Sequence, residues 1–110
     1  MPSYLNKVSG NVTANNDAVT VTFRHFANGG VGIFVDDLTN WTGTITFEAT
    51  RDATSWFSVN ATNDTTLATG TTTTVKGPFY VNVVGIVAAR ARLSTVGGNT
   101  AKITLIANPG

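Results

Sequence analysis

Three sets of side chains in this sequence have residue types that chemistry could use. Glu48 and Asp52 are carboxylates four positions apart, and a carboxylate pair is the arrangement that cleaves glycosidic bonds. Asp36 and Asp37 are adjacent carboxylates, which are oxygen ligands of the kind that Ca²⁺ prefers. His25 is the single histidine and therefore the single candidate for a base that titrates near neutral pH.

Each set lacks the companions that its chemistry requires. The residues around Glu48 and Asp52 give no sign of a raised pKa, and the aspartate pair lacks the ligand spacing of an EF-hand. His25 has no second histidine to share a metal with, and the chain has no cysteine. We therefore expect a protein that is not an enzyme and that holds no cofactor and no metal.

Arg90 and Arg92 form a different kind of pair. They alternate with apolar residues, so both arginines are expected on the outward face of one strand. Two interpretations stay open: the arginines pair with Glu48 on a neighbouring strand, or they bind an acidic partner. An exposed ion pair would contribute only about 0–1 kcal/mol, so we do not expect this one to be a main stabiliser.

The elements that must position these side chains are β-strands. Residues alternate strictly between apolar and polar from Thr44 to Ala49, a polar turn follows at 51–54, and the pattern resumes at 55–60. This predicts a central β-hairpin. Trp56 and Phe57 are adjacent and cannot both face the core of a flat strand. We expect Trp56 to be the larger core anchor.

Further alternating segments predict the rest of the fold; they are residues 18–26, 31–35, 77–84, 89–93 and 101–107. The Asn28-Gly29-Gly30 turn predicts that the first two of them form a hairpin. Residues 61–74 are polar and rich in threonine, which predicts a long loop. Residues 1–10 lack a clear period, which predicts an extended N-terminal arm or an edge strand.

Seven or eight short strands with turn signals between them and no substantial helix predict an all-β fold. We expect one antiparallel β-sandwich domain over residues 1–110, either jelly-roll or immunoglobulin-like.

Charged residues make up 12% of the chain and the net charge is +1, so the basic stripe of a nucleic-acid-binding protein is missing. No apolar run reaches the roughly 20 residues of a membrane helix, and no signal peptide is evident. We expect neither nucleic acid nor membrane as a partner.

Five segments from Trp41 onward carry a resemblance to a known group of proteins. They are Trp41–Glu48, Ser55–Val59, Tyr80–Gly85, Ala89–Ser94 and the last strand around Ile103–Leu105. The pattern resembles small β-sandwich virion proteins found among the capsid and tail genes of tailed double-stranded DNA phages. The chain departs from that pattern in the turn at 51–54, where the family usually has Asp-Gly.

The resemblance implies a capsid decoration, or cement, protein that is made in the host cytoplasm and located on the capsid surface of the virion. Such a protein binds the major capsid protein and stabilises the shell against internal DNA pressure, often as a homotrimer. The residues that we expect to contact the partner are Tyr4, Leu5 and Val8 of the arm, together with Arg90 and Arg92.

Two alternatives stay open. The first is another virion component, such as a part of the tail, the neck or a head fibre. The second is a carbohydrate-binding β-sandwich module that stacks sugars on Trp41, Trp56 or Tyr80. The second alternative requires at least one of these rings to be exposed beside polar groups.

Overall fold

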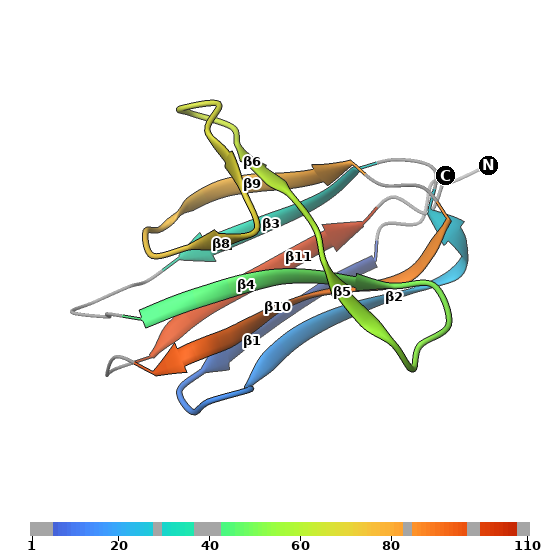
Figure 1. The fold of residues 1–110 in the computed structure, drawn as a ribbon, viewed down its shortest axis with the longest axis horizontal. Helices are drawn as coiled ribbons and strands as arrows, with labels where there is room; N and C mark the ends of the chain where they lie inside the picture. Colours follow the sequence, from blue (N-terminus) through green and yellow to red (C-terminus); the bar gives the residue numbers. More distant parts are fainter. Residues whose placement is uncertain (1–5, 28–29, 37–42, 83–84, 97–99, 108–110) are drawn as a thin grey trace.

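The computed structural model describes residues 6–27, 30–36, 43–82, 85–96 and 100–107. These residues form two antiparallel β-sheets that pack face to face (Figure 1), and no helix occurs among them. The predicted all-β sandwich is therefore confirmed. No helix in the described part of the chain is long and apolar enough to span a membrane.

The strands are β1 (Asn6–Val12), β2 (Ala18–Ala27), β3 (Gly30–Asp36), β4 (Gly43–Thr50), β5 (Trp56–Ser58), β6 (Ala61–Asn63), β7 (Thr69–Gly70), β8 (Thr72–Thr73), β9 (Gly77–Asn82), β10 (Ile86–Val96) and β11 (Ala101–Ala107). The first sheet has the order β1-β11-β3-β9-β6-β7. The second sheet has the order β2-β10-β4-β5, and β8 also pairs with β4. After β5 the chain leaves the second sheet and continues as β6 in the first (Figure 1).

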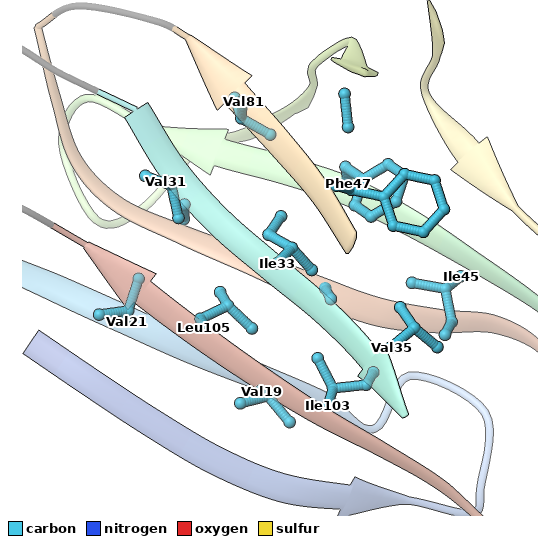
Figure 2. Close-up of a cluster of buried hydrophobic side chains, with 14 of the residues drawn as sticks. Val19, Val21, Val31, Ile33, Val35, Ile45, Phe47, Val81, Ile103 and Leu105 are labelled. Atoms are coloured by element: carbon cyan, nitrogen blue, oxygen red, sulfur yellow. The ribbon is translucent and has the colours of Figure 1, made fainter. Parts of the chain in front are cut away.

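The core fills the space between the sheets with the inward half of each alternating strand (Figure 2). In β3, for example, Val31, Ile33 and Val35 are buried while the residues between them face outward. Phe47 and Phe79 meet across the two sheets with ring centroids 5.2 Å apart. Each fully buried aliphatic or aromatic side chain contributes about 1.5–3 kcal/mol, so this cluster is the main source of stability.

The central hairpin is confirmed, but Phe57, and not Trp56, is the aromatic residue that faces the core. β4 and β5 pair with Ala49 opposite Phe57 and Thr50 opposite Trp56. Because Ala49 faces the core, Phe57 lies on the inner side and packs against the cluster. Trp56 lies on the outer face of the second sheet. The prediction that Trp56 is the core anchor is therefore wrong, because the register places its neighbour on the inner side.

The hairpin turn needs a residue with positive φ, and Ala53 takes that conformation with φ of 65°. A non-glycine residue in this region costs about 1–2 kcal/mol, and hydrogen bonds offset that cost. The Ala53 N–H donates to Thr50 Oγ1 at 3.0 Å, while the N–H groups of Thr54 and Ser55 donate to Asp52 Oδ1, each at 2.8 Å. Side-chain oxygens thus hold a turn that contains no glycine.

Two other predictions about chain organisation require correction. β2 and β3 do not form a hairpin, because β2 pairs with β10 in one sheet while β3 pairs with β11 and β9 in the other. A turn signal predicts that the chain reverses, but it does not select the strand that becomes the partner. Residues 28–29 of the predicted turn lie outside the described residues.

The second correction concerns residues 61–74, which contain β6, β7 and β8 and are not one long loop. Asn63 and Thr73 are buried there. Asn63 Oδ1 accepts the N–H groups of Thr65 and Thr66 at 2.8 and 3.0 Å. Short polar side chains that satisfy the local backbone allow this segment to be ordered without a large apolar contribution.

In the predicted N-terminal arm, residues 6–10 belong to the edge strand β1, which pairs with β11.

Candidate partner-binding surfaces

The outer face of the second sheet carries an ionic cluster of three residues, Glu48 with Arg90 and Arg92. β4 and β10 pair with Glu48 directly opposite Arg90. Arg90 Nε donates to Glu48 Oε1 at 2.7 Å and Arg92 Nε donates to the same oxygen at 3.0 Å. Arg92 Nη2 also donates to Glu48 Oε2 at 3.2 Å. The prediction that these arginines could pair with Glu48 on a neighbouring strand is confirmed.

This cluster is less exposed than the sequence pattern suggests. The exposed fraction of the side chain is 10% for Glu48 and 24% for each arginine. The Arg90 guanidinium lies over the Trp56 ring, with Cζ 4.0 Å from the ring centroid. Arg92 Nη1 donates to Asn16 Oδ1 at 2.9 Å. Trp56 thus holds the guanidinium group of Arg90 in place, and Asn16 holds that of Arg92.

The electrostatics of the cluster keep Glu48 ionised. Burial raises the pKa of Glu48, but hydrogen bonds from Arg92 and Arg90 outweigh burial, so the pKa is lowered overall. The hydrogen bond to Glu48 raises the pKa of Arg92. Backbone N–H groups of Ser55 and Thr54 lower the pKa of Asp52.

The candidate acid–base groups have pKa values that move away from those of a glycosidase general acid. A general acid needs a raised pKa, and the pKa values of Glu48 and Asp52 both move in the opposite direction. Among the described residues, no three His, Cys, Asp or Glu side chains gather as a metal site. Asp37, of the adjacent aspartate pair, lies outside the described residues, and His25 lies in β2.

The five predicted contact residues do not all come together. Arg90 and Arg92 share one face of the second sheet, whereas Val8 lies on β1, at the edge of the first sheet. Val8 pairs with the buried Leu105 and is nevertheless 36% exposed, because β1 has a neighbour in its own sheet on one side only. Tyr4 and Leu5 lie outside the described residues.

A second surface lies on the outer face of the first sheet. Tyr80 is the only residue of this surface that the sequence indicated, as a candidate sugar-stacking ring. β3 and β9 pair with Gly32 opposite Tyr80 and Phe34 opposite Pro78. A Cβ atom on Gly32 would lie 3.1 Å from the ring of Phe34, so this ring lies over the glycine. Tyr80 is 40% exposed beside it. The sequence signal for this surface is a glycine two residues before a phenylalanine on the outward side of a strand.

An open hollow of about 390 Å³ adjoins this surface. It is lined by Phe34, Val35 and Asp36 at the end of β3 and by Lys76, Gly77 and Pro78 at the start of β9. Asp36 and Lys76 are exposed, and no hydrogen bond or ion pair links either side chain to another described residue. The hollow thus combines a ring, a carboxylate and an ammonium group.

Of the three rings considered for sugar stacking, the structure describes two. Tyr80 is the exposed one, and its cross-strand neighbour in β6 is Thr62, so it stands beside a polar group. Trp56 is half-buried, and Arg90 occupies one of its faces. Trp41 lies outside the described residues.

These features define the chain as an antiparallel β-sandwich with two different outer faces. No known protein family matches the sequence, and no curated protein matches it either. Among solved structures, the chain is similar to the SPBc2 prophage-derived protein YomS, with a TM-score of 0.69 over 96% of each chain. The two sequences are 14% identical, so the likeness is one of fold.

Proposed function

We propose that this protein is a non-enzymatic structural protein of a tailed phage, and specifically a capsid decoration protein that binds the major capsid protein on the outside of the shell. The observation that carries the proposal is the likeness to a prophage-derived protein over 96% of both chains. The segments that resemble phage virion proteins include those around β4, β5, β9, β10 and β11, and these strands form much of the shared sandwich.

The ionic cluster gives the proposal a binding surface. Arg90 and Arg92 are fixed by Glu48, Trp56 and Asn16, yet a quarter of each side chain reaches solvent. Guanidinium groups that are already ordered lose little further freedom when they meet acidic groups on a shell. In the proposal, the arginines supply this contact, and Val8 on the edge strand β1, together with Tyr4 and Leu5, contacts a neighbouring subunit.

Repetition of the contact supplies the strength. Many copies of a weak contact, related by the symmetry of the shell, bind far more tightly than one copy alone. We propose a homotrimer, in which three copies of the surface engage neighbouring capsid subunits around one symmetry axis. The proposed location is the capsid surface, after synthesis in the host cytoplasm.

The proposal is tested by mixing purified protein with undecorated capsids and sedimenting the mixture. We expect the protein to sediment with capsids and to saturate at a fixed ratio to the major capsid protein. The double variant Arg90→Gln with Arg92→Gln is expected to bind less, while Lys102→Gln, an exposed charge on the other sheet, is the matched control. Failure of the wild-type protein to sediment with capsids would contradict the proposal.

The trimer is tested separately by light scattering of the purified protein. We expect the folded protein in solution to have a mass equal to that of three chains. A mass of one chain, both in solution and after release from capsids, would refute the trimer. Shell binding would not be affected by that result, because the sedimentation experiment tests it separately.

A further inference from the structure

The outer face of the first sheet carries two aromatic side chains near two exposed charged groups that form no ion pair with another described residue. The Phe34 ring lies across Gly32, and Tyr80 stands directly opposite Gly32 on β9. The two rings are therefore diagonal neighbours on one face of the sheet, a placement in which aromatic side chains reach each other. Pro78 extends the same face opposite Phe34.

The polar groups of the hollow lie beside this surface at one end of the β3–β9 pair. Asp36 supplies an acceptor of hydrogen bonds and Lys76 supplies a donor, and both are exposed. The volume of about 390 Å³ falls in the range of small-molecule sites, about 300–1,000 Å³. A few polar groups around a mostly apolar wall is the composition that gives such sites their specificity.

A ligand that fits these groups must have one flat apolar face and a rim of hydroxyl groups. A pyranose ring has this form, because its C–H groups gather on one face and its hydroxyls point outward around the edge. The C–H face packs on the electron-rich face of an aromatic ring. Hydroxyl groups both donate and accept, so one sugar can donate to Asp36 and accept from Lys76.

We propose that the hollow at the end of the β3–β9 pair binds a pyranose unit of a polysaccharide. Phe34 in the hollow is the stacking ring, Tyr80 beside the hollow extends the stacking surface, and Asp36 and Lys76 are the hydrogen-bonding groups. The inference does not depend on shell binding, since it involves the outer face of the other sheet. A copy that docks through Arg90 and Arg92 would leave this face free to meet a surface glycan.

The test is a titration of the ¹⁵N-labelled protein, followed by NMR, with the methyl glycosides of glucose, galactose, N-acetylglucosamine and rhamnose. At least one of them is expected to bind with millimolar affinity, as suits a small open site. The shifted signals are expected to cluster at residues 32–36 and 76–80. The proposal is wrong if no glycoside shifts these signals at concentrations far above the expected millimolar dissociation constant. It is also wrong if the shifts fall at other residues.

Matched variants separate stacking from general surface effects. Phe34→Ala is expected to weaken binding about two- to tenfold, the order expected for the loss of one aromatic contact, and Asp36→Asn is expected to weaken it as well. Leu67→Ala, at an exposed apolar side chain outside the β3–β9 pair, is expected to bind as the wild-type protein does. If Phe34→Ala fails to fold, Tyr80→Ser at an exposed position provides the same comparison. Equal affinity for the stacking variant and the wild type would overturn the proposal.

A proline-rich peptide is the competing ligand, because exposed aromatic rings also bind such segments. We expect it to leave the signals of residues 32–36 and 76–80 unchanged. If the peptide shifts these signals and none of the glycosides does, the surface is a peptide site and the sugar proposal is refuted.

Discussion

Replacing Glu48 by glutamine tests whether the ionic cluster stabilises the fold. Glu48→Gln keeps the size of the side chain but removes the charge that accepts three N–H groups from Arg90 and Arg92. A hydrogen bond to a charged group contributes about 1.5–3 kcal/mol net, and a buried group left without its partner costs about 1–3 kcal/mol. The arginines are partly exposed and water replaces some of the loss, so we expect a cost of about 2 kcal/mol.

That cost translates into a shift of the melting temperature. For 110 residues, an unfolding entropy of about 2.1 cal/mol/K per residue gives about 0.23 kcal/mol per degree. A loss of 2 kcal/mol then lowers Tm by about 9 °C, which thermal denaturation followed by circular dichroism at neutral pH detects easily.

The matched control for this variant is Asp36→Asn. It also neutralises one carboxylate, but Asp36 is exposed and forms no ion pair with another described residue. A surface change of this kind stays within about 0.5 kcal/mol, or about 2 °C. If Glu48→Gln lowers Tm no more than Asp36→Asn does, the cluster contributes little and the argument from its burial is wrong.

Three further predictions address the titration, the core and the aromatic surface. Because the folded pKa of Glu48 lies below its ordinary value of 4.5, the stability it provides is present at neutral pH and is lost as the pH falls below about 4.5. Acid titration of Tm should therefore be flatter in Glu48→Gln than in the wild type, and parallel curves would contradict this. Phe47→Ala removes a ring that is 1% exposed and should cost about 3–5 kcal/mol in urea unfolding; a cost below about 1 kcal/mol would contradict the core assignment. Gly32→Ala places a Cβ 3.1 Å from the Phe34 ring, so it should displace the ring and weaken glycoside binding in the NMR titration, whereas unchanged affinity would count against the stacking surface.

The sequence was most informative where a strand has one buried face. Alternation identified the inward residues of β3 and β4, and it placed the last strand at 101–107, where β11 lies. These predictions succeed because the period of two depends only on which side of a strand meets the core. The same reasoning put Arg90 and Arg92 on one outward face with Glu48 as a possible partner, and the structure pairs them.

Two of the predictions that failed depend on which strands pair and in which register. Pairing of β2 with β10, and of β1 with β11, joins segments from opposite parts of the chain, which no local pattern encodes. The choice between Trp56 and Phe57 for the core depended on register, and a shift of one residue reverses it. The hollow exists only because β3 pairs with β9, so neither Phe34 nor Lys76 could be recognised from its own segment.

The most direct test of the proposed function is cryo-electron microscopy of the phage particle that carries this protein. We expect density of the two-sheet sandwich on the outer surface of the capsid, repeated at symmetry-related positions, with the face of Arg90 and Arg92 toward the shell. Density for the protein in the tail or the neck, or none on the particle, would contradict the account.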